Sequence, residues 1–428
     1  MERRKFLKTG TGVAGFGLIA GCIGGGDGGD GGDGGDGGDG GDGGGETTTM
    51  ASGDGGDGGA TSTPTSPVTI GALEPLSGNF TPWGQAHLPG LEFAVSRINA
   101  DGGVMGRELE IVSEDTESDA SSANTIFQRF DEQEDIAVAT GPVSSDVGIR
   151  TSRTAEDLEI PLFLHMAGSD AVISRSDRYT FRVGILPATP YAGVQSQIVQ
   201  DRGYSQVGAI IGDYAWGQSV KSSIEENFET DVQIETAPVG ASDFKPFIRQ
   251  FSQDLEMMIA SGHPPGTISI FGQMQELGYE PEITTDPGLP PGVIWGALGE
   301  TATQGMAHNH LTDIYSDDFR AVASAFAEAN DARMDTHGGY GYVTGQLIAA
   351  AIEEAGSAEP PAIADALRTI ELDTIFANPI QYTEYGELDN QRYIYSQFEA
   401  GAPDYYSDGA WRLTEFLRTD PIPAFDPG

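Results

Sequence analysis

The chain has 428 residues, of which 65 are acidic and 22 are basic, so its formal net charge at pH 7 is −43. This balance argues against nucleic-acid binding, because recognition of a phosphate backbone needs clustered Lys and Arg. Because molar salt shortens the Debye length to about 3 Å and screens self-repulsion, and because 38% of the residues are hydrophobic, we expect a globular protein adapted to high salt rather than a disordered acidic chain.

Export and lipid-anchoring signals are expected in residues 1–22. Residues 3–8 resemble the twin-arginine export motif, and the weakly apolar run that follows is too short to span a bilayer, which takes about 20 residues. Residues 19–22 resemble a lipobox, in which the thiol of Cys22 receives lipid. Cys22 is the only cysteine, which excludes an intramolecular disulfide. We therefore expect the protein on the outer face of the cell membrane, held by a lipid anchor.

A flexible tether is predicted over residues 23–67. The segment is mostly Gly, Asp, Ser and Thr and contains a Gly-Gly-Asp repeat over residues 27–42. It has almost nothing to bury, so it should stay disordered. Its r.m.s. reach is about 35–40 Å, from about 5–6 Å multiplied by the square root of its roughly 45 residues.

Strand and helix patterns alternate from residue 68 onward. Alternation at this spacing is typical of βαβ units and parallel sheets, and two successive sets of elements predict two similar lobes. Expected strands are 68–73, 108–113, 136–140, 161–164, 207–212, 232–236, 255–260 and 293–297; expected helices are 84–99, 120–133, 145–158, 193–202, 218–228, 244–253, 265–277, 316–330 and 341–355; short strands are expected in 376–413.

The carboxyl ends of these strands are the predicted ligand site, because ligands of parallel α/β sheets bind there. In this chain the ends are rich in Gly, Ser and aromatic residues. Hydroxyl groups and helix N-terminal amides hold anions, and aromatic rings cover the apolar parts of a ligand. The segments concerned are 74–83, 115–119, 141–146, 165–169, 213–216 and 262–267.

Several segments, taken in order and spacing, resemble the type I periplasmic binding proteins of the branched-chain amino acid uptake family. The resemblance implies an α/β fold of two Rossmann-like lobes with parallel sheets, hinged by three crossings and closing on a ligand. We place lobe 1 at 68–185 plus 306–388, and lobe 2 at 186–305 plus 389–428. The matching pieces, between about 68 and 398, are Leu76-Ser77-Gly78, Trp83-Gly84-Gln85, 97–104, Gly106-Arg107, Asp115, 141–145, Phe181-Arg182, Trp216-Gly217-Gln218, Asp243-Phe244 and 276–279.

The resemblance also implies roles for individual residues. Ser145 matches the family serine that binds the α-carboxylate of the ligand, and Ala167 and Ser169 match the next loop, which holds carboxylate and ammonium. Trp216 matches an aromatic residue of the second lobe. The positions matching the lining of the side-chain pocket are Trp83, Val143 and Ser144.

Two departures from the family pattern leave the ligand open. His263 stands where the family has a second-lobe aromatic residue, and Asp286 lies near the position of the acidic residue that often binds the ammonium. Amino acids, amides, urea-like compounds and carboxylates all remain candidates. The complete set of expected ligand-binding residues is Trp83, Val143, Ser144, Ser145, His165, Ala167, Gly168, Ser169, Trp216 and His263.

The function that the resemblance implies is capture of a small solute for the permease subunits of an ABC importer. We expect no enzyme, since there is no Gly-x-Ser-x-Gly elbow and the sole cysteine lies in the lipobox. No cofactor is expected, and His308 and His310 alone are too few to predict a metal site. The alternatives are a sensory ligand-binding protein of the same fold and an amidase-type surface hydrolase.

Overall fold

The structure is a computed structural model that describes residues 66–261, 266–285, 288–406 and 409–428. The expected export signal, Cys22, His263 and nearly all of the expected tether lie outside the described residues. Ser66 and Pro67, which we had assigned to the tether, are held by the folded part: their carbonyls accept hydrogen bonds of 2.8 and 2.9 Å from Arg107.

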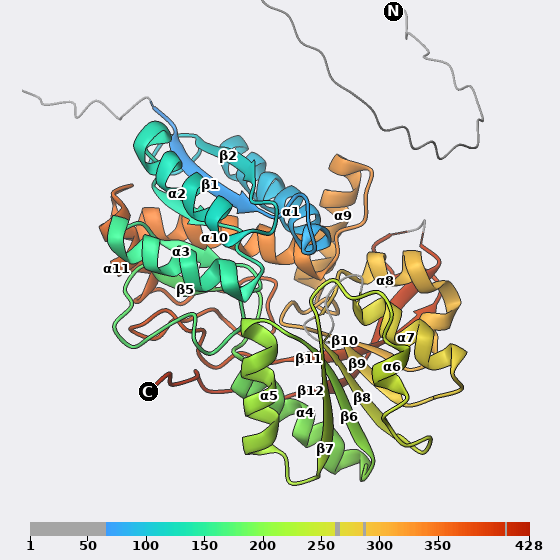
Figure 1. The fold of residues 1–428 in the computed structure, drawn as a ribbon. Coiled ribbons are helices and arrows are strands. Elements are labelled where there is room, and N and C mark those ends of the chain that lie inside the picture. The colour runs from blue at the N-terminus through green and yellow to red at the C-terminus, as the bar shows by residue number, and fades with distance from the viewer. Residues whose placement is uncertain (1–65, 262–265, 286–287, 407–408) are drawn as a thin grey trace, which may run out of the picture. The chain divides into compact units, whose positions relative to one another are not determined.

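Helices and strands alternate over most of the described chain (Figure 1). The strands are β1 (Val68–Glu74), β2 (Leu109–Asp115), β3 (Val138–Thr140), β4 (Leu162–Leu164), β5 (Thr180–Arg182), β6 (Val207–Gly212), β7 (Val232–Ala237), β8 (Met257–Ser261), β9 (Glu282–Thr285), β10 (Met306–His310), β11 (Ile394–Ala400) and β12 (Trp411–Arg418). The helices are α1 (Thr81–Ala100), α2 (Ala120–Glu134), α3 (Ser145–Leu158), α4 (Ala188–Arg202), α5 (Ala215–Asn227), α6 (Lys245–Ile248), α7 (Gly266–Glu276), α8 (Pro291–Leu298), α9 (Asp317–Asn330), α10 (Thr336–Ala355) and α11 (Pro360–Leu367), with a 3-10 helix at Gly299–Thr303.

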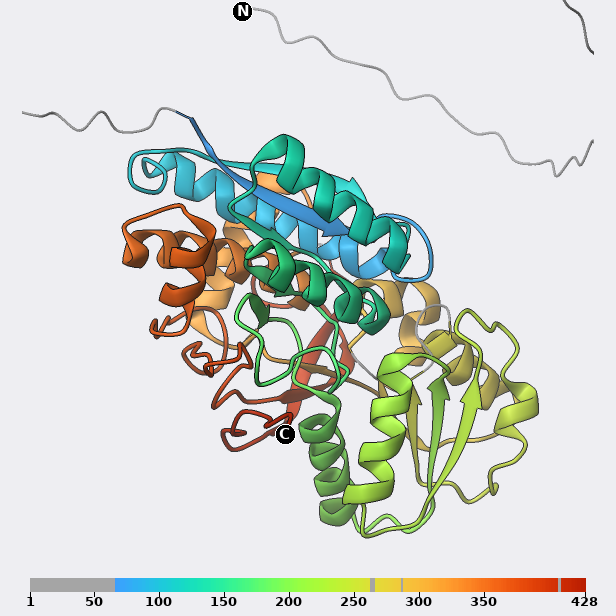
Figure 2. The ribbon, with the colours of Figure 1, turned by 60° about the vertical axis from the view of Figure 1, so that its left-hand side comes forward.

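The first sheet is wholly parallel, with strand order β2-β1-β3-β4-β5. Because side chains alternate along a strand, β1 sends Ile70 and Ala72 to the face covered by α1 and Leu73 to the opposite face. Leu73 there joins a core with Phe127 of α2 and Ala155 of α3. Figure 2 shows β1 between these layers of helices.

The second sheet repeats this arrangement and extends it. Its strand order is β12-β11-β10-β9-β8-β6-β7, so the part from β7 to β10 has the same order as the first sheet. β11 and β12 add an antiparallel pair at the β10 edge. The repeated parallel order confirms the expected α/β fold of two Rossmann-like halves.

Two sequence-based placements need correction. Residues 306–310, which the sequence-based bounds place in lobe 1, form strand β10, and this strand pairs with β9 and β11 of the second sheet. The expected strand at 293–297 is helix α8, because Pro291 at its start favours helix initiation and Gly299, with φ of 56°, ends it. A short apolar run alone does not distinguish a strand from a helix.

Helices α1 and α10 pack closely on the first lobe because glycines line their contact. A Cβ added to Gly90 would lie 1.9 Å from the carbonyl oxygen of Gly338, and one added to Gly341 would lie 2.1 Å from that of His87. This close packing brings the N-terminal turn of α10, with His337, against the middle of α1. No helix among the described residues is both long and apolar enough to cross a bilayer.

Candidate ligand-binding site

The loop between β3 and α3 carries three of the expected residues. Val143, Ser144 and Ser145 are all buried, and Ser144 is the N-cap residue of α3. The hydroxyl oxygen of Ser145 accepts a 3.0 Å hydrogen bond from the backbone N–H of Ser169. The structure therefore joins the two loops that the sequence assigned to ligand binding.

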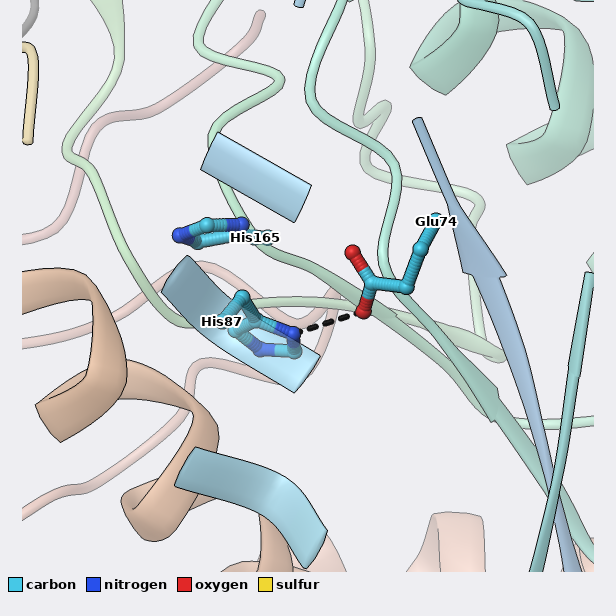
Figure 3. A group of neighbouring side chains, drawn as sticks. All are labelled: Glu74, His87 and His165. Carbon is cyan, nitrogen blue, oxygen red and sulfur yellow. Dashed lines mark hydrogen bonds and ion pairs between the residues drawn. The ribbon is translucent and has the colours of Figure 1, made fainter. Parts of the chain in front are cut away.

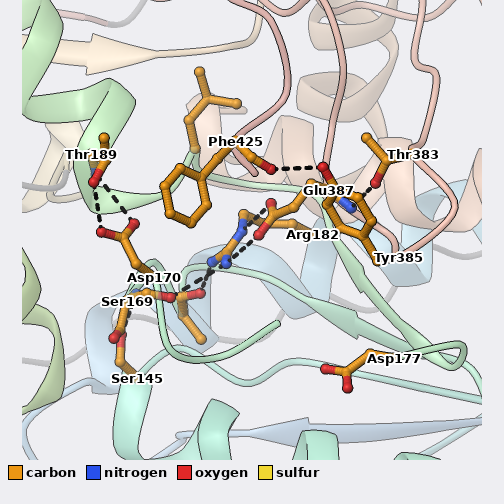
Figure 4. A network of polar contacts seen from close by, with 12 residues as sticks. Ser145, Ser169, Asp170, Asp177, Arg182, Thr189, Thr383, Tyr385, Glu387 and Phe425 are labelled. Carbon is orange, nitrogen blue, oxygen red and sulfur yellow. Dashed lines mark hydrogen bonds and ion pairs between the residues drawn. The ribbon is translucent and has the colours of Figure 1, made fainter. Parts of the chain in front are cut away.

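A buried arginine contacts the loop after β4 (Figure 4). Arg182 donates to the carbonyl oxygens of Ala167 and Ser169. Its guanidinium also forms a two-point ion pair with Glu387, at 2.8 and 2.9 Å, and both side chains are fully buried. Arg182 lies in β5 and Glu387 just before the chain returns to the second sheet, so this pair ties the ligand loop to the crossing segments.

The two lobes touch at these loops. Ser169 and Ser219 of α5 share a 2.8 Å hydrogen bond between their hydroxyls. A Cβ added to Gly168 would lie 2.3 Å from the ring of Trp216, so this ring rests directly on the loop backbone. The indole N–H of Trp83 donates to the carbonyl oxygen of Gly288, at 3.2 Å. The described conformation is therefore closed, with residues of both sheets meeting at their carboxyl ends.

Two acidic side chains flank the closed loops. Burial raises the pKa of Asp146, although its carboxylate accepts a hydrogen bond from the backbone N–H of Ala215 in the other lobe. Burial also raises the pKa of Asp170, which accepts from the hydroxyl and backbone N–H of Thr189 at 2.8 and 3.2 Å. These carboxylates place negative charge beside the contact between the lobes. Asp286, expected near the position of the ammonium-binding acid, lies outside the described residues.

His165, in the loop after β4, belongs to a buried row of polar groups that runs from Glu74 and His87 through His165 and His337 to the carbonyl oxygen of Gly288. Its Nε2 is 3.0 Å from Nδ1 of His337, and Nε2 of His337 is 2.6 Å from the carbonyl oxygen of Gly288. Its ring also stacks on that of His87, which shares a 2.7 Å hydrogen bond with Glu74 (Figure 3). Burial holds the pKa of His165 well below its ordinary value and lowers that of His337 to about 3, while it raises the pKa of Glu74.

The structure brings together most of the ligand-binding residues expected from the sequence. Nine of the ten expected residues are described and lie on the loops or helix starts around the lobe contact, and His263 falls outside the described residues. The sequence placed Glu74 only within the strand-end segment 74–83, without a role of its own, and gave His87 no role. The available signals were a carboxyl group ending an apolar strand and a histidine on the apolar face of the next helix.

Comparisons with known proteins agree with this architecture. A family model described as periplasmic binding protein matches residues 67–402. The chain is 26% identical over 347 residues to the Leu/Ile/Val-binding protein BraC3 of Rhizobium johnstonii, covering 78% of this chain and 92% of that protein. It is also 26% identical over 319 residues to the chemotactic signal transduction system substrate-binding protein BasB of Halobacterium salinarum, covering 71% of this chain and 74% of that protein.

Solved structures share the fold. A solute-binding protein of an ABC transporter from R. palustris, in complex with benzoate, aligns with a TM-score of 0.72 at 18% identity, covering 84% of this chain and 98% of that one. The branched-chain amino acid transporter substrate-binding protein LivJ of Streptococcus pneumoniae, in complex with isoleucine, aligns with a TM-score of 0.71 at 18% identity, covering 82% and 99%.

Proposed function

This chain belongs to the periplasmic binding protein family, and we propose that it captures a small solute outside the cell for an ABC importer by closing its two lobes. The observation that carries this proposal is the meeting of the two sheets' carboxyl ends at Ser145, Ser169 and Trp216. Closure supplies hydroxyls and aromatic surface from both sides, which suits reversible binding without covalent change.

An amino acid is the ligand class that the site supports best. The hydroxyls and the N-terminal amides of α3 suit a carboxylate, and the carboxylates of exposed Asp146 and half-buried Asp170 beside the lobe contact suit an ammonium group. A relative is named for binding Leu, Ile and Val, which favours a branched-chain or related side chain.

A thermal-shift screen tests this proposal. Amino acids, amides and small carboxylates are added to the purified protein in high salt, and we expect branched-chain or related amino acids to raise the melting temperature most. The same melts at low salt should show a lower melting temperature, as expected for a salt-adapted acidic protein. No response to any amino acid would contradict the proposed ligand class, and turnover of an amide would favour the hydrolase instead.

Removing the two serine hydroxyls should weaken binding of the ligand found in the screen. For Ser145→Ala combined with Ser169→Ala we expect a loss of about 1–3 kcal/mol per hydroxyl, because buried polar groups of the ligand are left unpaired. Isothermal calorimetry measures the change. Ser324→Ala, which removes an exposed hydroxyl on α9, is the matched control and should leave the affinity unchanged; equal affinities for all three proteins would refute the site.

A sensory role is the second candidate, because a relative is a chemotactic substrate-binding protein. The two roles differ in the membrane partner of the closed form. If the partner is a permease, deleting the gene should abolish uptake of the ligand. If the partner is a signal transducer, the deletion should abolish movement toward the ligand and leave its uptake unchanged.

We also propose that the protein is exported through the twin-arginine route and anchored by lipid on Cys22. The order of the arginine pair, the short apolar run and the lipobox in residues 1–22 supports this proposal. Cys22→Ser should release the protein into the medium, since the thiol that accepts the lipid is lost. Fractionation of cells and medium checks this, and continued membrane association of the variant would contradict anchoring through Cys22.

A further inference from the structure

Three side chains from separate elements meet in the first lobe: Glu74 at the end of β1, His87 in α1 and His165 in the loop after β4 (Figure 3). All three are fully buried. Each offers one ligand atom, nitrogen or carboxylate oxygen, and these three atoms lie within 4.8 Å of one another. Donor atoms of the kinds that bind metals are therefore gathered at one buried point.

The same three residues carry polar atoms that nothing else satisfies. Oε2 of Glu74, Nε2 of His87 and Nδ1 of His165 are buried and have no hydrogen-bond partner among the described residues. Leaving such atoms unpaired in a folded interior is costly, and native proteins rarely do so without a bound ion, water or ligand. Three such atoms on neighbouring side chains mark this point as one where a bound ion or other partner would be stabilising.

The hydrogen bonds behind His165 fix which of its nitrogens is free to bind. The carbonyl oxygen of Gly288 only accepts, so Nε2 of His337 donates to it at 2.6 Å. Nδ1 of a neutral His337 ring then accepts, so Nε2 of His165 donates to it at 3.0 Å. Nδ1 of His165 is left as a bare lone pair. Metal-binding histidines are typically oriented in this way, by an N–H bond from their second nitrogen.

We propose that Glu74, His87 and His165 bind a divalent transition-metal ion of the Zn²⁺ type. Two imidazole nitrogens and one carboxylate suit such an ion, whereas Ca²⁺ and Mg²⁺ prefer oxygen ligands alone. The sequence had predicted no metal site, because its three ligands are far apart along the chain.

The three ligand atoms need to move only slightly closer together to reach zinc-ligand distances. Three atoms spaced at most 4.8 Å apart have a common centre no more than about 2.8 Å from each, and zinc ligands lie at about 2.0–2.2 Å. The rings of His87 and His165 are stacked at 4.2 Å with 26° between their planes, so they must also tilt toward each other before both in-plane lone pairs point at one ion.

The position of the site links it to the lobe contact. His165 lies two residues before Ala167 of the ligand loop, and its bond to His337 continues to Gly288, whose carbonyl also accepts from Trp83. A bound ion fixes the ring of His165. It thereby also fixes the contacts of His165 with His337, and of His337 and Trp83 with the carbonyl oxygen of Gly288. Loading the site should therefore stabilise the fold independently of any organic ligand.

Zinc titration of the chelator-treated full chain, in high salt with excess Mg²⁺ to occupy the acidic surface, tests the proposal. We expect one Zn²⁺ per chain by calorimetry and a higher melting temperature. Glu74→Gln and His165→Gln should each weaken binding at least tenfold, whereas Glu117→Gln, an exposed carboxylate of the same lobe, should not. Absence of a one-to-one site in the unmutated protein, or unchanged affinity in both variants, would overturn the assignment.

Cobalt provides a readout that does not depend on the variants folding. Co²⁺ bound by two imidazoles and a carboxylate with few waters should give an intense visible absorption band in the unmutated protein, and Zn²⁺ should displace it. A weak spectrum like that of hydrated Co²⁺ would mean that only surface carboxylates bind and would overturn the proposal. The same band should be lost in Glu74→Gln and His165→Gln. Circular dichroism of these variants shows whether they are folded, so that a lost band can be assigned to the lost ligand.

Discussion

Glu387→Ala is expected to lower the free energy of unfolding by about 3–5 kcal/mol, the usual cost of breaking a buried ion pair on one side. Both Arg182 and Glu387 have fully buried side chains, so the substitution leaves the guanidinium charged without a counterion. Arg182 also holds the carbonyl oxygens of Ala167 and Ser169, so ligand affinity should fall along with stability. Denaturant unfolding in high salt measures the first effect and calorimetry the second.

The chain provides a matched control for this prediction. Glu399 pairs with Arg412 at 2.8 Å, but the two side chains are 44% and 50% exposed. Glu399→Ala should therefore cost less than about 1 kcal/mol, as exposed ion pairs do. Equal destabilisation by the two substitutions would show that burial of Arg182 and Glu387 does not set the energy of their pair.

Gly168→Ala is expected to weaken ligand binding about tenfold to a hundredfold. The added Cβ would lie 2.3 and 2.8 Å from two ring carbons of Trp216, closer than real contacts allow. The indole is rigid and buried, so the lobes must move apart, at the cost of about 1–3 kcal/mol that is typical of overpacking. Calorimetry gives the affinity, and small-angle X-ray scattering should show a larger radius of gyration in the variant with ligand present.

Gly193→Ala is the control for the glycine substitution. Gly193 lies in α4, where an added Cβ meets nothing within 4 Å. Alanine there should leave affinity unchanged and should stabilise the helix slightly, by up to about 1 kcal/mol. If Gly168→Ala bound ligand as tightly as the unmutated protein, contact between its loop and Trp216 would not be needed for closure.

The parallel halves were predictable because their signals are local. Buried strands such as β1, β3 and β6 are short apolar runs ending in Gly or a polar loop, and amphipathic helices follow them. This alternation of strands and helices predicts both Rossmann-like units. It did not identify β9 and β10, because their sequences, Glu-Ile-Thr-Thr and Met-Ala-His-Asn-His, carry no apolar alternation. These strands form because neighbours in the sheet supply the hydrogen bonds.

The ligand loops were partly predictable for the same reason. Ser145 begins a helix directly after a strand, and Ser169 lies in the next strand-end loop, so parallel-sheet geometry alone places them near each other. The sequence could not show that Ser145 accepts from the backbone of Ser169 or that Trp216 covers Gly168. Those contacts depend on how far the two lobes close.

The sequence by itself determined the acidic charge, the two-lobed α/β class and the loops where a ligand is expected. The tertiary structure alone decided the pairing of Arg182 with Glu387 and the row from Glu74 and His87 through His165 and His337 to Gly288. The physical reason is that periodicity and turn chemistry act between neighbours in the chain. Buried polar partners are chosen by packing between segments that the chain brings together from distant positions.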